Sequence, residues 1–147
     1  MQTDQILLVE DNPDDVTFTQ RAFRKNNFGN PIIVARDGLA AMELLLPPAG
    51  AEPLRPSFVL LDINLPRMSG LEVLRRLRSE EATKLLPVIM LTTSNDSRDV
   101  LSSYESGANS FVRKPVSFDE FLRAVKTLGV FWLELNEQVP PKGHEPG

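Results

Sequence analysis

Five polar residues in this chain lie at or next to the end of a short hydrophobic run: Glu10, Asp11, Asp62, Thr92 and Lys114. Short apolar runs that alternate with helical patterns are typical of buried parallel strands. The carboxyl ends of parallel strands meet at one edge of an open α/β sheet, and ligands bind outside that edge. The sequence therefore predicts that three carboxylates, one hydroxyl and one ammonium group lie together at one edge of a sheet.

Such a group of side chains is suited to phosphoryl transfer. Three carboxylates repel one another unless a cation joins them, and ligands that are all oxygen atoms favour Mg²⁺, with Mn²⁺ as the alternative. The metal, the Lys114 ammonium and the Thr92 hydroxyl would stabilise the spread charge of a transferring phosphoryl group. An aspartate can act as the nucleophile and form an aspartyl phosphate, and the candidate is Asp62, at the end of the central run.

The segments between these residues predict five strands that alternate with five helices. The strands are expected near residues 5–10 and 31–35, up to residue 62, from residue 87 and after residue 109. The helices are expected from residues 12, 38 and 69, after a capping cluster at 94–97, and over 118–135. A (βα)5 alternation predicts an α/β fold, a doubly wound parallel five-stranded sheet with helices on both faces.

The composition is that of one globular domain without a thiol. The chain has 147 residues, of which 41% are hydrophobic, a net charge of −4 and no cysteine. We expect one domain over residues 1–135 and a disordered tail over residues 136–147. There is no basic run, no apolar segment of membrane length and no leader pattern. These features argue against nucleic-acid and membrane partners and predict a cytoplasmic protein.

Four segments together resemble the receiver domain of two-component response regulators, the CheY-like family with its flavodoxin-like fold. They are Leu-Val-Glu-Asp-Asn (8–12), Leu-Leu-Asp-Ile-Asn-Leu-Pro-Arg-Met-Ser-Gly (60–70), Pro-Val-Ile-Met-Leu-Thr-Thr-Ser (87–94) and Gly-Ala-Asn-Ser-Phe-Val-Arg-Lys-Pro (107–115). They occur in the family's order and at its spacing, and the resemblance covers residues 4–134. It implies a phosphorelay protein that is not an enzyme with its own substrate, although a receiver catalyses its own phosphorylation and dephosphorylation. No output domain is expected after residue 135, so output would pass through protein contacts.

The resemblance implies roles for the acidic residues. Asp62 would accept the phosphoryl group from a histidine of a sensor kinase. The metal would be held by Glu10, Asp11, Asp62 and the backbone carbonyl of Asn64.

The same resemblance implies a set of switch residues. Lys114 would pair with the phosphoryl oxygens, and Thr92 would move toward them while Phe111 turns into the vacated space. Thr93 stands beside the acceptor where the family often has a smaller residue, so access to the acceptor would be tighter. The bond between Lys114 and Pro115 is expected to be cis.

A narrower resemblance is to the stand-alone regulators that partner bacterial phytochromes. It rests on the expanded loop at residues 47–56, on Leu-Thr-Thr-Ser at 91–94 and on an aromatic end of the last helix. It implies that a bacteriophytochrome is the candidate kinase. It also implies a homodimer through the face between strand four and helix five, with Phe131, Trp132 and Leu135 as candidate contacts.

Three other function classes are compatible with parts of the pattern. A flavodoxin-like flavin carrier would need a phosphate-binding loop after the first strand, where this chain has acids instead, and the protein would be coloured. An aspartate-nucleophile phosphatase would need a second acid two residues after Asp62, where this chain has Asn64, and it would turn over phosphomonoesters. A pseudo-receiver that never takes phosphate would act by binding alone, and only phosphate uptake separates it from a working receiver.

Overall fold

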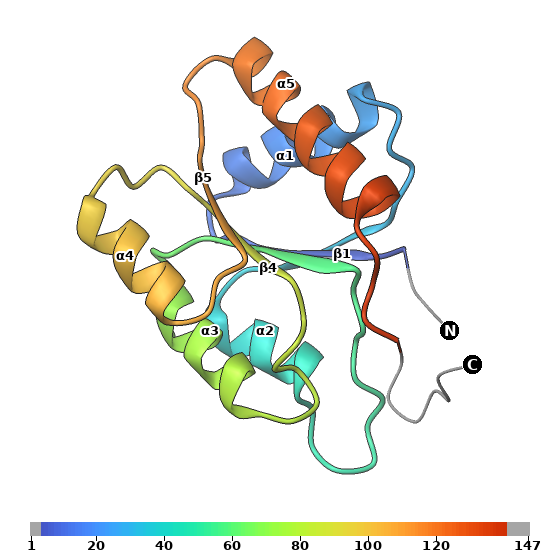
Figure 1. Cartoon of the computed structure of the whole chain (residues 1–147), viewed down its shortest axis with the longest axis vertical. Coiled ribbons are helices and arrows are strands. Elements are labelled where there is room, and N and C mark those ends of the chain that lie inside the picture. The colour runs from blue at the N-terminus through green and yellow to red at the C-terminus, as the bar shows by residue number, and fades with distance from the viewer. Residues whose placement is uncertain (1–3, 141–147) are drawn as a thin grey trace.

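The computed structural model describes residues 4–140 and contains one parallel five-stranded sheet covered by helices on both faces (Figure 1). The strands are β1 (Ile6–Val9), β2 (Ile32–Ala35), β3 (Phe58–Leu61), β4 (Val88–Thr92) and β5 (Ser110–Arg113). The helices are α1 (Pro13–Lys25), α2 (Gly38–Leu45), α3 (Gly70–Ser79), α4 (Ser97–Glu105) and α5 (Phe118–Gly129), followed by the π-helix η1 (Val130–Leu135). The predicted (βα)5 fold is confirmed.

The sheet has the strand order β2-β1-β3-β4-β5, with every neighbouring pair parallel. The inner strands β1, β3 and β4 are buried along their whole length, which is why their sequences are continuous apolar runs rather than alternating patterns. The register pairs Val9 with Leu61 and Leu61 with Met90. The carboxyl ends of the three inner strands therefore finish at nearly the same level.

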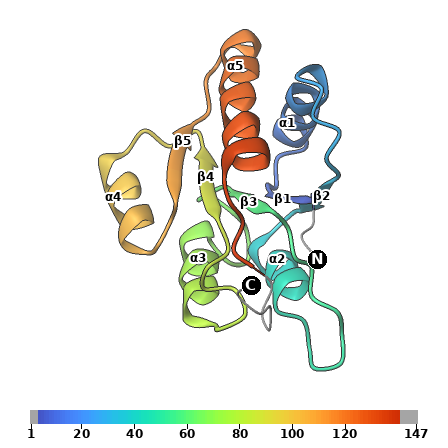
Figure 2. The ribbon, with the colours of Figure 1, turned by 45° about the vertical axis from the view of Figure 1, so that its right-hand side comes forward.

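The two faces of the sheet carry separate hydrophobic cores. One core joins alternate strand residues, such as Leu7 and Val59, to α2 and α3. The other joins the remaining strand residues, such as Leu8 and Leu60, to α1 and α5. Figure 2 shows α1 and α5 side by side on one face and α2 and α3 on the other. The sheet is thus held from both sides, as a doubly wound arrangement requires.

Helices begin where the sequence supplies a capping side chain. Asn12 accepts from the backbone N–H groups of Asp14 and Asp15, and Pro13 occupies the first helical position. The other N-caps are Asp37, Ser69, Asp96 and Ser117. Among the five α-helices, α4 buries the fewest side chains, since Ser103 is its one buried residue.

The long last helix predicted over residues 118–135 changes character near its end. The α-helical part ends at Gly129, and residues 130–135 form the π-helix η1. A Cβ atom at Gly129 would lie 2.1 Å from the ring of Phe28, so glycine allows the close approach of that ring. Trp132 then packs near Phe58 at the start of β3, with 6.3 Å between ring centroids.

Residues 136–140 have no helix or strand, and the Gln138 amide donates to the Ser57 hydroxyl at 3.1 Å. Residues 141–147 of the predicted disordered tail lie outside the described part, so that prediction and the domain boundary at residue 135 stay predictions. No helix within residues 4–140 is long and apolar enough to cross a membrane.

Candidate functional site

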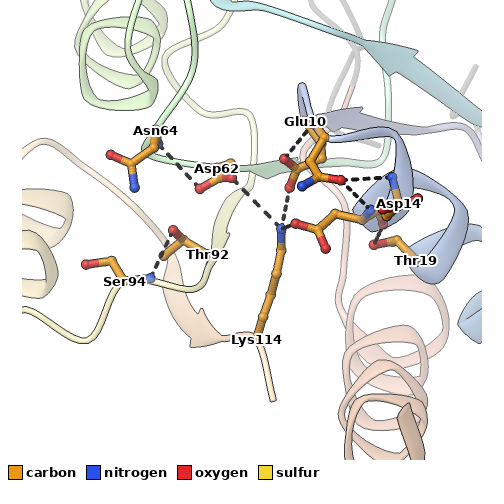
Figure 3. A network of polar contacts seen from close by, with 10 residues as sticks. Glu10, Asp14, Thr19, Asp62, Asn64, Thr92, Ser94 and Lys114 are labelled. Atoms are coloured by element: carbon orange, nitrogen blue, oxygen red, sulfur yellow. Dashed lines mark hydrogen bonds and ion pairs between the residues drawn. The ribbon is translucent and has the colours of Figure 1, made fainter. Parts of the chain in front are cut away.

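Backbone hydrogen bonds of the sheet continue past the strand ends and hold the predicted site residues in place. Glu10 N donates to Ala35 O at 3.0 Å and Asp62 N to Val9 O at 3.2 Å. Lys114 N donates to Thr92 O at 2.8 Å. Each of these residues is therefore fixed by the ladder of the neighbouring strand, and their side chains meet at the carboxyl edge of the sheet (Figure 3).

The three predicted acids form one group. Carboxylate oxygens of Glu10, Asp11 and Asp62 lie within 4.8 Å of one another, the one such group that residues 4–140 contain. Glu10 is 2% exposed and Asp62 is 8% exposed, whereas Asp11 is open to solvent. Because every donor is an oxygen and one side is open, the group fits a hard divalent cation that keeps some of its water.

Asp62 is held by the loop that returns to α3. Gly70 N donates to Ile63 O at 2.8 Å, and a Cβ atom at Gly70 would lie 2.0 Å from the Asp62 carbonyl oxygen. Glycine at this position therefore allows α3 to start directly against the end of β3. Asn64 is exposed, and its backbone N–H lies 3.4 Å from Asp62 Oδ1. The metal-ligand role of the Asn64 carbonyl stays a prediction.

Lys114 is the buried cation of the site. Its ammonium contacts the Glu10 carboxylate, lies 3.2 Å from Asp15 Oδ2 and lies 3.9 Å from Asp62 Oδ2. Burial alone would lower the Lys114 pKa, but the contact with Glu10 and the charges of Asp62 and Asp15 raise it above its usual value. The lysine thus stays charged at neutral pH.

The Glu10 carboxyl has a raised pKa. Burial raises the pKa of Glu10 to about 7, against the pull of Lys114, and the negative charge of Asp62 adds to the rise. A carboxyl with this pKa is partly protonated at neutral pH in a site without a metal. One ammonium does not neutralise the negative charges of Glu10, Asp11 and Asp62. A bound divalent cation would reduce the repulsion among them.

The predicted switch residues lie at the end of β4, directly after it, and in β5. Thr92 is fully buried at the end of the strand, and its Oγ1 accepts from Ser94 N at 3.3 Å. Thr93 is exposed. Phe111 is half-buried and packs against the core on the α2 and α3 side of the sheet. Nothing among these contacts tests the switching roles, which stay predictions.

The predicted cis bond before Pro115 is not found. No peptide bond within residues 4–140 is cis, so Lys114 and Pro115 are joined in trans. The trans form is the lower-energy form of an X–Pro bond by roughly 0.5–1 kcal/mol. With this bond in trans, Lys114 N still pairs with Thr92 O and the ammonium still reaches Glu10.

Two residues of the site neighbourhood were missing from the sequence-based prediction. Asp15 accepts from the Lys114 ammonium at 3.2 Å. The sequence could have placed Asp15 near the site, because the first turn of the helix that follows β1 lies at the carboxyl edge of the sheet. Asp99 accepts from the Ser94 hydroxyl at 2.5 Å, which links the loop after β4 to α4. This pairing has no signature in the sequence.

The candidate dimer residues differ in their exposure to solvent. Phe131 is 47% exposed and Leu135 is 67% exposed. Trp132 is half-buried and packs against the core on the α1 and α5 side. Core packing therefore accounts for Trp132, whereas Phe131 and Leu135 remain open to a partner.

The fold and the acidic edge are those of a phosphorelay module, and the chain belongs to the response regulator receiver domain family, whose sequence pattern matches residues 6–126. It is 38% identical over 136 residues to the probable methanogenesis regulatory protein FilR2 of Methanothrix harundinacea, covering 92% of this chain and 88% of FilR2. It is 38% identical over 130 residues to the response regulator Rcp1 of Synechocystis, covering 88% of each chain.

Solved structures give the same result. The phosphorylated cyanobacterial phytochrome response regulator RcpA superposes with a TM-score of 0.84 at 32% identity, covering 94% of this chain and 99% of RcpA. The Mn²⁺-bound form of Rcp1 gives 0.84 at 36% identity, covering 93% and 99%. The bacteriophytochrome response regulator AtBRR gives 0.69 at 43% identity, covering 93% and 100%. The predicted receiver family is confirmed.

Proposed function

We propose that Asp62 accepts a phosphoryl group from a histidine of a sensor kinase in the presence of Mg²⁺, and that the product changes the protein's contacts. The observation that carries this proposal is the buried Lys114 ammonium beside Glu10, 3.9 Å from Asp62 Oδ2. A structural lysine would need one acid, whereas this one is placed beside a nucleophile and a group of metal-binding oxygens.

The transfer can be assigned to atoms. An Asp62 carboxylate oxygen forms the new O–P bond while the N–P bond of the phosphohistidine breaks. The electron pair of that bond stays on the imidazole nitrogen, and a phosphohistidine protonated on its second ring nitrogen leaves as neutral histidine. Lys114 lies close enough to shift onto a phosphoryl oxygen and balance its charge.

The acidic group would hold the metal. Glu10, Asp11, Asp62 and the Asn64 carbonyl would bind Mg²⁺, which supplies positive charge to the phosphoryl oxygens when it is bound. The similar Rcp1 has been solved with Mn²⁺, which supports a divalent ion of this kind. The protein's own part is to keep Glu10 and Asp62 close together and largely out of water.

The switch would begin at Thr92. Its hydroxyl oxygen now accepts from Ser94 N, and a phosphoryl group on Asp62 would be a charged acceptor to which the hydroxyl could donate its hydrogen. Phe111 lies on β5 beside β4 and packs against the core on the α2 and α3 side. A shift of Thr92 would therefore change the packing around the Phe111 ring. The expected output is a changed surface near α4 and β5.

The decisive experiment is intact-mass detection of phosphate uptake from a small acyl-phosphate donor. We expect one phosphoryl adduct in native protein with Mg²⁺, and none in Asp62→Asn or with a chelator. Asp14→Asn is the matched control, because it removes a nearby exposed charge without touching the acidic group. Lack of an adduct in folded, metal-loaded native protein would refute the proposal and leave a binding-only pseudo-receiver.

We also propose a bacteriophytochrome as the kinase partner. The similarity to RcpA, a phytochrome response regulator, and to AtBRR, a bacteriophytochrome response regulator, supports this choice. Phosphotransfer from a purified bacteriophytochrome kinase should exceed transfer from an unrelated histidine kinase by at least about tenfold in initial rate. Equal rates from the two kinases would contradict the phytochrome link while leaving Asp62 chemistry intact.

A homodimer through the α4, β5 and α5 side and the C-terminal segment completes the proposal. Exposed apolar side chains there support it: Leu101 and Tyr104 on α4, Val116 before α5, and Phe131 and Leu135 on η1. Light scattering of native protein should give twice the chain mass, and Phe131→Glu with Leu135→Glu should give the monomer. A native monomer at micromolar concentration would refute the dimer.

A further inference from the structure

The ammonium of Lys114 is shared among acids from three different elements. Glu10 follows β1, Asp62 follows β3, and Asp15 lies in the first turn of α1. The distance from Nζ to Asp15 Oδ2 is 3.2 Å, within hydrogen-bond range, whereas the distance to Asp62 Oδ2 is 3.9 Å and lies outside it. In this structure the lysine is therefore bonded to Glu10 and Asp15 rather than to the acceptor aspartate.

Asp15 is firmly placed for this contact. Its backbone N–H donates to the Asn12 side chain at 3.2 Å, and its carbonyl accepts from the Thr19 hydroxyl at 2.8 Å. Its side chain is 33% exposed and does not belong to the group of converging metal-binding oxygens. The ion pair that Asp15 makes is with Lys114, so its charge acts on the lysine rather than on a metal.

We propose that Asp15 is a positioning residue for Lys114: it holds the ammonium on the α1 side of the site and competes for it with a phosphoryl group on Asp62. This inference rests on the proposed function. Asp15 stabilises the unphosphorylated arrangement, in which Lys114 is withdrawn from the acceptor by a hydrogen bond that phosphorylation has to break. The residue sets how readily Asp62 takes phosphate, without touching the phosphoryl group itself.

Removal of the Asp15 charge has a definite expected effect. In Asp15→Asn the ammonium loses its ionic bond to α1 and is free to approach Asp62. The initial rate of phosphate uptake from an acyl-phosphate donor should then rise about threefold, the size that a partly exposed ion pair supplies. Asp14→Asn is the matched control, because Asp14 precedes Asp15, carries the same charge and has an exposed side chain. The uptake rate of Asp14→Asn should stay within about 1.5-fold of the native rate.

Two further arms show whether Asp15 acts through the lysine. Asp15→Glu keeps the charge and should restore a rate close to native. In a Lys114→Gln background uptake should be slower than in native protein, and adding Asp15→Asn should leave that slower rate unchanged. A threefold rise that persists without the lysine would overturn the proposal, because the charge would then be acting on the donor or the metal.

A readout without phosphate tests the contact itself. The chain has five lysines, so the ammonium signal of Lys114 can be assigned in a ¹H–¹⁵N spectrum by its loss in Lys114→Gln. The signal should exchange with water slowly in native protein and Asp14→Asn, and several-fold faster in Asp15→Asn.

The outcomes separate the two proposals. Uptake by native protein with equal rates in Asp15→Asn and Asp14→Asn overturns the role of Asp15 alone. A fall in rate in Asp15→Asn overturns it as well, since Asp15 would then hold the lysine in its productive place. No uptake by native protein refutes the proposed function and the competition together, whatever the ammonium spectrum shows.

Discussion

The raised pKa of Glu10 should make metal binding depend on pH in a range where ordinary carboxylates are at least about nine-tenths ionised. A divalent cation binds the ionised form, so protons compete with it below pH 7. With a pKa of about 7, the ionised fraction of Glu10 falls about 30-fold between pH 8 and pH 5.5. We therefore expect the Mn²⁺ dissociation constant to rise about 30-fold over this range.

Calorimetric titration with Mn²⁺ at the two pH values measures this change directly. An acid with the usual pKa of 4.5 would lose only about a tenth of its ionised form at pH 5.5. A change in affinity below about twofold would therefore refute the assignment of a raised pKa to Glu10. Glu10→Gln should bind Mn²⁺ weakly with little pH dependence, whereas Glu43→Gln, an exposed control, should behave as native.

The raised pKa of Glu10 also makes the free energy of unfolding of the metal-free protein depend on pH. Stability should be greater at low pH, whereas metal affinity should be greater at high pH. Because the folded pKa lies above the unfolded one, the stabilisation is complete below pH 4.5 and is lost as pH rises through about 7. The rise in the Glu10 pKa from 4.5 to about 7 corresponds to about 3 kcal/mol. Urea unfolding of metal-free protein should show this contribution in native protein and lack it in Glu10→Gln.

Three further predictions concern the framework of the site. Gly70→Ala places a Cβ atom 2.0 Å from the Asp62 carbonyl oxygen. We expect the free energy of unfolding in urea to fall by about 2–3 kcal/mol and phosphate uptake to slow. Gly29→Ala is the control, because a Cβ atom at Gly29 meets nothing within 4 Å. The Arg78 guanidinium donates to the backbone carbonyls of Gly107 and Leu86, both at 2.8 Å. Arg78→Lys cannot make this planar pair of hydrogen bonds and should lower the free energy of unfolding by about 2 kcal/mol. The same change at the exposed Arg75 should lower it by less than about 0.5 kcal/mol. Ser94→Ala loses a 2.5 Å bond to Asp99 and should raise hydrogen exchange in α4 about tenfold; no change relative to Ser102→Ala would contradict the link between the loop and the helix.

Much of the fold and the acidic group could be predicted from the sequence because their causes are local. Continuous apolar runs mark strands buried on both faces, and Asn12 with Pro13 marks the start of α1. Parallel strands bring their carboxyl ends to one edge wherever they lie in the chain, which is why Glu10 and Asp62 could be placed together.

The remaining features depend on contacts between distant segments. The contact between Asp15 and Lys114 joins residues 99 positions apart, and the sequence alone does not say which of several acids the ammonium selects. The ring of Phe28 lies against Gly129, directly before the π-helix η1, and no pattern within the last helix reveals this contact. The trans bond before Pro115 differs from the family-based prediction, since both isomers of an X–Pro bond are close in energy.

The two ends of β3 serve different surfaces. Its carboxyl end carries Asp62, while its amino end, at Phe58, is covered by Trp132 of η1. A strand of four residues is only about 13 Å long, but it is stiff and buried on both faces. A partner that contacted Phe131 and Leu135 without α4 would therefore be expected to stay attached whether or not Asp62 carries phosphate. Recognition that depends on phosphate would then be expected at α4, which buries one side chain.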